Sequence, residues 1–109
     1  MYDKAKGFFH GKEGYNCAQA VLAAFRDEKN ISQAVIDEFK AYGGGRVANG
    51  YCGALHAALY LAGDDQAVQK KLKDAFMEKA GALTCKEIKA TSKLPCGDCV
   101  GLAAQTLKS

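Results

Sequence analysis

The sequence predicts an all-α fold, a compact single-domain bundle of about five to six short helices with cysteines at helix N-termini. Apolar residues recur at three- and four-residue spacing along most of the chain, as in Val21, Ala24 and Phe25. No stretch alternates apolar and polar residues convincingly, so we expect no sheet. The 109 residues match the size of one domain, and we therefore expect residues 1–109 to form a single cysteine-rich helical domain.

Three helices are predicted in the first part of the chain. Residues 2–12 carry an apolar stripe that includes Phe8 and predict a short helix. Asn16 can cap a second helix that has Cys17 in its first turn. Asn30, with Gln33 three residues later, resembles a capping box for a third helix that ends near residue 42.

The stretch from Gly43 to Gly63 leads from a glycine run to Cys52 and then into a central helix over about residues 51–61. This helix is apolar on nearly all sides, which indicates a buried position. Gly63 is suited to end it, and Asp64 or Asp65 can cap a further helix through about residue 80.

Two more helix starts, each with a cysteine, follow in the last part of the chain. Thr84 and Glu87 form a capping box that places Cys85 at the first position of a short helical turn. Pro95 is suited to the entry of a last helix that contains Cys96 and Cys99.

Composition and charge exclude several classes of partner. The net charge is only +3 and the lysines are scattered among acids, so we expect no binding to nucleic acid. There is no apolar run of the length that spans a bilayer, so we expect no membrane insertion. The N-terminus lacks the apolar segment of a secretory signal, and we expect a cytoplasmic protein.

The five cysteines are the main indication of function: Cys17, Cys52, Cys85, Cys96 and Cys99. In a reducing compartment, several cysteines more often serve redox, catalytic or metal-binding roles than permanent disulfides. Helix starts that converge would gather these sulfurs in an electropositive pocket, and the N–H groups of a helix N-terminus lower the pKa of a nearby thiol such as Cys52. The alternative is that the cysteines only fill core space.

The cysteine spacing leaves two kinds of chemistry open. Cys96 and Cys99 have the CxxC spacing of dithiol oxidoreductases, although the βαβ pattern of thioredoxin is missing. The same thiolates could instead ligate zinc or an iron–sulfur cluster. His56 follows Cys52 by four residues, so on a helix the two could share a metal or a proton, although a single histidine on an apolar helix is more often a core residue. The cofactor stays open: none, a metal ion or an iron–sulfur cluster.

The order of four short motifs resembles the C_GCAxxG_C_C family of redox-active proteins. The motifs are GYNCAQAVL (Gly14 to Leu22), CGALHA (Cys52 to Ala57), FMEKAGALTC (Phe76 to Cys85) and a C-terminal cysteine followed by VGLAA. The resemblance covers nearly the whole chain and implies redox chemistry. It places the four characteristic cysteines of the family at Cys17, Cys52, Cys85 and Cys96. The same four cysteines are the metal ligands in the alternative interpretation. Cys99 is then an addition, and Ala57 stands where the family motif has glycine.

We therefore predict a redox-active protein that uses Cys17, Cys52, Cys85, Cys96 and Cys99 for thiol–disulfide exchange or electron transfer. Cys52 and Cys17 are expected to form one element, with the other three as partners or resolving thiols. The sequence does not establish whether the protein is a thiol–disulfide oxidoreductase. It also does not establish which cysteines pair or which redox partner the protein meets. The alternative is a non-enzymatic protein that binds a metal ion or an iron–sulfur cluster through these cysteines, with His56 as a possible further ligand. A third hypothesis is a helical interaction module whose cysteines only pack.

Overall fold

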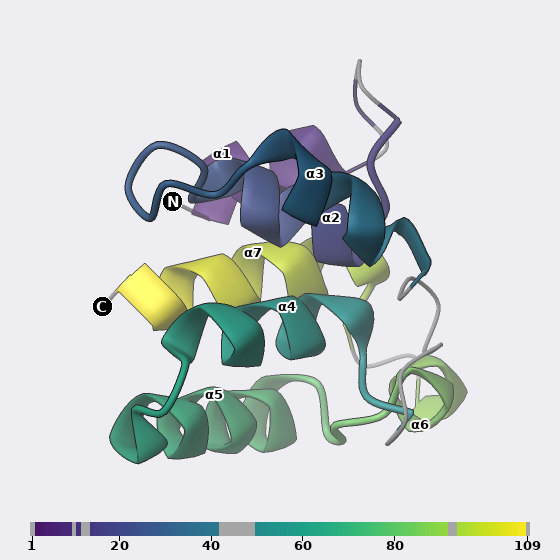
Figure 1. Cartoon of the computed structure of the whole chain (residues 1–109). Helices are drawn as coiled ribbons and strands as arrows, with labels where there is room; N and C mark the ends of the chain where they lie inside the picture. Colours follow the sequence, from purple (N-terminus) through teal and green to yellow (C-terminus); the bar gives the residue numbers. More distant parts are fainter. Residues whose placement is uncertain (1, 10, 12–13, 42–49, 92–93, 109) are drawn as a thin grey trace.

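The chain folds into a helical bundle around its last helix (Figure 1). The computed structural model describes residues 2–9, 11, 14–41, 50–91 and 94–108. These residues form α1 (Tyr2–Phe8), α2 (Cys17–Ala24), α3 (Gln33–Glu38), α4 (Gly53–Ala62), α5 (Gln66–Lys79), α6 (Cys85–Thr91) and α7 (Cys96–Lys108). Within these ranges there are two isolated β-bridges and no strand, so the predicted all-α class is confirmed for them.

The number of helices differs from the expected five to six. Seven are present in the described ranges, because residues 85–91, which we expected to form a short turn, continue as α6. No helix in this part of the chain is both long enough and apolar enough to cross a bilayer.

α7 contacts α1, α2, α4 and α5, and α2 also packs against α4. In the view of Figure 1, α1 and α2 lie on one side of α7, and α4 and then α5 lie on the other. All eight residues of α2 are buried, because its sequence CAQAVLAA offers small side chains that let neighbouring helices approach closely. The largest fully buried side chains, including Phe25, Phe76 and Leu55, fill the space between these layers.

Local capping explains where most helices begin. The Asn16 side chain accepts a hydrogen bond from the Gln19 backbone at 2.8 Å, and the Asn16 N–H donates to the Gln19 side chain at 3.1 Å, forming a capping box. Asp65 caps α5 by accepting from the Val68 N–H. Gly63, with φ of 61°, ends α4 in the left-handed region that favours glycine.

The predicted cap of the third helix was wrong. Ser32, not Asn30, is the N-cap of α3, and its hydroxyl accepts from the Val35 N–H at 3.3 Å. Asn30 instead adopts φ of 52° and ends the turn after α2, a conformation that asparagine tolerates better than most residues. The buried Gln19 side chain donates to the Ile36 carbonyl at 3.0 Å and fixes α3 against α2.

A short antiparallel contact holds the start of α4 beside the segment that leads into α6. Tyr51 and Thr84 form a β-bridge, and the Cys52 N–H donates to the Leu83 carbonyl at 2.9 Å. The Thr84 hydroxyl accepts from the Glu87 N–H at 3.2 Å, as the predicted capping box requires. The glycine run at 43–45, predicted to permit the turn before Cys52, lies outside the described residues.

Candidate functional site

Three cysteines from three different helices meet in the core. Cys17 is the first residue of α2, Cys52 is the N-cap of α4, and Cys99 lies in the first turn of α7. Their exposed fractions are 6%, 4% and 2%, and all three side chains are thiols in this structure. Cys52 forms hydrogen bonds with both Cys17 and Cys99. We refer to Cys17, Cys52 and Cys99 as the thiol cluster.

The environment of Cys52 raises its pKa. The hydrogen bond with Cys17 lowers this pKa, but the hydrogen bond with Cys99 and burial raise it by more, to about 12. The backbone of Leu55 in the first turn of α4 contributes only a small lowering, and the Cys52 side chain makes no capping hydrogen bond. The first turn of α4 does lower the pKa of Cys52, as expected, but burial and the neighbouring Cys99 outweigh this effect and the net shift is upward.

Cys99 is held at the entry of α7. Its N–H donates to the Pro95 carbonyl at 3.0 Å, which makes Pro95 the start of the helix as predicted. Its thiol lies 3.8 Å from the Leu94 carbonyl oxygen, to which it donates a weak hydrogen bond.

The other two cysteines are placed by their backbones only. Cys96 is the first residue of α7 and Cys85 the first residue of α6, two residues after the Leu83 carbonyl that accepts from Cys52. The side chains of Cys85 and Cys96 lie outside the described part of the structure.

His56 packs beside an aromatic ring. Its ring stacks on Phe39 with centroids 5.6 Å apart, and burial lowers its pKa. The backbone N–H of His56 donates to the backbone carbonyl of Cys52 at 2.9 Å, as the first turn of α4 requires. Among the residues described, no group of three or more histidine, cysteine, aspartate and glutamate side chains is arranged to hold a metal ion.

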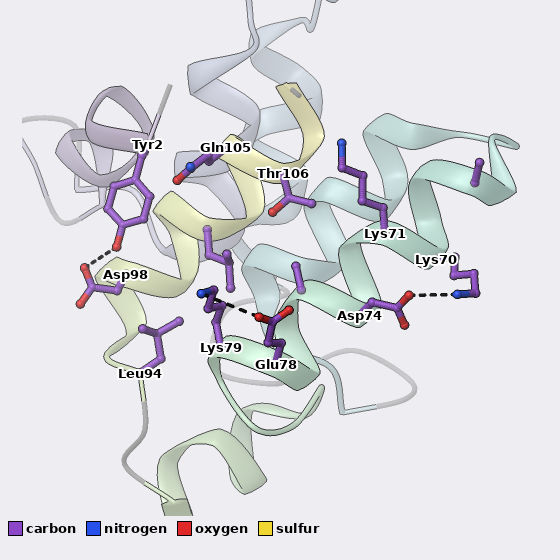
Figure 2. Close-up of a pocket in the computed structure, with 13 residues that line it drawn as sticks. Tyr2, Lys70, Lys71, Asp74, Glu78, Lys79, Leu94, Asp98, Gln105 and Thr106 are labelled. Carbon is purple, nitrogen blue, oxygen red and sulfur yellow. Dashed lines mark hydrogen bonds and ion pairs between the residues drawn. The ribbon is translucent and has the colours of Figure 1, made fainter.

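A polar network that we did not predict from the sequence lies beside the thiol cluster. Asp98 accepts hydrogen bonds from the Tyr2 hydroxyl and the Lys6 ammonium, each at 2.8 Å, and these contacts dock α1 on α7. Figure 2 shows the contact between Tyr2 and Asp98. The hydrogen bonds from Lys6 and then Tyr2 lower the pKa of Asp98. Asp98 lies between the two cysteines of the CxxC motif. An acidic residue inside that motif is the feature of the sequence that could have indicated this network.

Ala57, where the family motif has glycine, is completely buried in α4. A methyl group is thus accommodated in the helix packing at this position.

Comparison with known proteins gives one match. The family model described as "Putative redox-active protein (C_GCAxxG_C_C)" matches residues 15–109, a range that begins after α1. No curated protein and no solved structure matches the chain.

Proposed function

Because the chain belongs to the C_GCAxxG_C_C family of redox-active proteins, we propose that its thiol cluster carries out thiol–disulfide exchange. The observation that carries this proposal is the contact of the Cys52 thiol with the thiols of Cys17 and Cys99. Three thiols from distant parts of the sequence share one buried site at the starts of three helices. Such a site can store two electrons as two thiols and release them by forming one disulfide.

We assign the disulfide to Cys52 and Cys99. A disulfide requires the two sulfurs to approach to about 2 Å, and sulfurs already in hydrogen-bond contact need only a local movement to do so. The pKa of Cys52, raised to about 12, keeps this thiol protonated near neutral pH, and the protonated form is not the nucleophile. In this scheme Cys99 therefore attacks first, and Cys52 resolves.

The reaction balances as a two-electron exchange. The Cys99 thiolate attacks one sulfur of an oxidised partner's disulfide, forms a mixed disulfide and displaces the first partner thiol. Cys52, once deprotonated, attacks the Cys99 sulfur and displaces the second partner thiol. The partner gains two electrons and the two protons that Cys52 and Cys99 lose.

Cys17 has a supporting role in this scheme. Its hydrogen bond with Cys52 lowers the pKa of Cys52, which favours the thiolate that must form in the resolving step. Serine at this position can still donate a hydrogen bond, whereas alanine cannot.

The test uses protein that is purified anaerobically and reduced, then oxidised with one equivalent of diamide and mapped by non-reducing mass spectrometry. We expect a Cys52–Cys99 disulfide in the unmodified protein and its loss in Cys52→Ser. Cys17→Ser is the matched control, because it removes an equally buried thiol and should keep the Cys52–Cys99 bond. If Cys52→Ser takes up oxidising equivalents at the same rate and to the same extent as the unmodified protein, the assignment fails.

A further inference from the structure

Cys52 is the central thiol of the cluster, because it contacts two thiols that come from two other helices. Its side chain forms hydrogen bonds with Cys17 and with Cys99. The helix packing gives the same arrangement: α2, α4 and α7 each pack against the other two, and each carries its cysteine at its N-terminal end. Because both neighbouring sulfurs already touch that of Cys52, either of them can bond to it after a local movement.

The proposed function uses Cys17 only through its hydrogen bond and leaves its sulfur without a reaction. This sulfur is nevertheless held against Cys52, which carries one end of the disulfide after the protein has been oxidised. Thiol–disulfide exchange needs a thiolate and a disulfide sulfur within reach of each other. A fixed position beside the target makes such a step many orders of magnitude faster than the same step between separate molecules. Cys17 is thus placed as a nucleophile toward the Cys52 sulfur.

The helix starts around the thiol cluster favour the negative charge that moves during an exchange. The N–H groups at the starts of α2, α4 and α7 carry partial positive charge, and each of these helices brings one cysteine of the cluster. The first turns of α2 and α4 contain no acidic residue. The acid in the first turn of α7, Asp98, is bonded to Tyr2 and Lys6 of α1. Negative charge can therefore pass between the three sulfurs without meeting an unpaired carboxylate in these first turns.

We propose that Cys17 is a third reacting thiol, which moves the disulfide of the oxidised protein from Cys52–Cys99 to Cys17–Cys52. This proposal rests on the proposed thiol–disulfide function and adds one step after it. The Cys17 thiolate attacks the Cys52 sulfur, so that the Cys52–Cys99 bond breaks and the Cys17–Cys52 bond forms. Cys99 leaves as a thiolate and takes up the proton that Cys17 lost. The step therefore needs no oxidant or reductant.

The rearrangement separates the disulfide from the thiol that reacts with the partner. In the reverse of the resolving step, a partner thiol attacks the Cys99 sulfur of the Cys52–Cys99 disulfide, and after the rearrangement Cys99 offers no disulfide to attack. The released Cys99 thiol also regains its hydrogen bond to the Leu94 carbonyl, whose sulfur–oxygen distance is 3.8 Å in the reduced protein. A carbonyl oxygen accepts better than a disulfide sulfur, the acceptor left to a Cys17 thiol. We therefore expect Cys17–Cys52 to be the more populated disulfide at equilibrium.

A time course of disulfide mapping tests the proposal on the unmodified protein. The reduced protein is oxidised anaerobically with one equivalent of diamide, and samples are quenched in acid at times from seconds to hours. Free thiols are then alkylated under denaturing conditions, and the disulfides are identified by mass spectrometry. We expect Cys52–Cys99 first and its conversion to Cys17–Cys52 afterwards, with a first-order rate that is the same at several protein concentrations. A rate that rises with protein concentration would overturn the proposal, because the exchange would then occur between molecules.

Two variants identify the reacting thiols. Cys17→Ser lacks the attacking sulfur, so its Cys52–Cys99 disulfide should persist through the whole time course. A double variant with Cys85→Ser and Cys96→Ser keeps only the three thiols of the cluster and should show the same conversion as the unmodified protein. Loss of the conversion in the double variant, or a Cys52–Cys99 disulfide that persists in the unmodified protein, would overturn the proposed rearrangement and leave the proposed function in place. If the unmodified protein forms no Cys52–Cys99 disulfide at any time, the proposed function itself fails.

Discussion

Gly101→Ala tests the close packing of α1 on α7. A Cβ atom at Gly101 would lie 2.7 Å from three ring atoms of Tyr2, well inside the normal contact distance of about 3.5–4.0 Å. The ring cannot turn away freely, because the Tyr2 hydroxyl is bonded to Asp98. Such overpacking costs about 1–3 kcal/mol, against a gain of about 1 kcal/mol from replacing glycine by alanine inside a helix. We expect a net loss of about 1 kcal/mol and a thermal midpoint lower by about 4–6 °C.

Denaturant unfolding of the reduced protein measures this change, and two further variants separate its causes. Gly97→Ala, in the same helix, would bring its Cβ no closer than 3.6 Å to Lys6 and Phe9, so it should be neutral or stabilising by about 0.5 kcal/mol. In a Tyr2→Ala background the steric conflict is gone, and Gly101→Ala should then stabilise. If Gly101→Ala is equally destabilising with and without the Tyr2 ring, the packing argument is refuted.

Asp98→Asn should cost about 0.5–1 kcal/mol by weakening the contact with Lys6, whose side chain is half exposed, and the difference from the unmodified protein should shrink in 1 M salt. The folded state raises the pKa of Cys52 from its ordinary 9.0 to about 12, so the associated stability is complete below about pH 9 and is lost as the pH rises toward 12. Unfolding free energies between about pH 8 and pH 11 should therefore fall less steeply in Cys52→Ser. Burial lowers the pKa of His56, so the stability it contributes is present above its ordinary pKa of 6.5 and is lost as the pH falls below that value. An NMR titration midpoint of His56 at or above 6.5 would contradict this.

Much of the helix pattern was predictable because capping is local. Asn16, Asp65 and Thr84 cap helices through side-chain contacts with residues three positions later, and this spacing is visible in the sequence. The choice between Asn30 and Ser32 as the N-cap of α3 was not predictable, because both residue types cap helices. It depends on where α3 docks on α2, which the tertiary hydrogen bond from Gln19 to the Ile36 carbonyl determines.

The candidate site was predictable in residue type but not in arrangement. Cysteine count and helix starts indicated Cys17 and Cys52, yet nothing local distinguishes Cys99 from Cys96, which is three residues earlier on the same helix. The structure places Cys99 against Cys52, although the family resemblance made it an addition to the four characteristic cysteines. The sign of the Cys52 pKa shift also depends on depth of burial, which a helix start alone does not reveal.

Depth of burial has a direct consequence for the proposed chemistry. A thiol whose pKa is about 12 is almost entirely protonated near neutral pH, and the thiolate is the reactive form. Protonation therefore protects Cys52 from chance oxidation. A Cys99 sulfur bound in a mixed disulfide has neither a thiol hydrogen nor a charge, so the contributions of Cys99 that raise the pKa of Cys52 are removed, while the hydrogen bond with Cys17 still lowers this pKa. The resolving thiol thus becomes easier to ionise only after substrate has reacted, which orders the two steps.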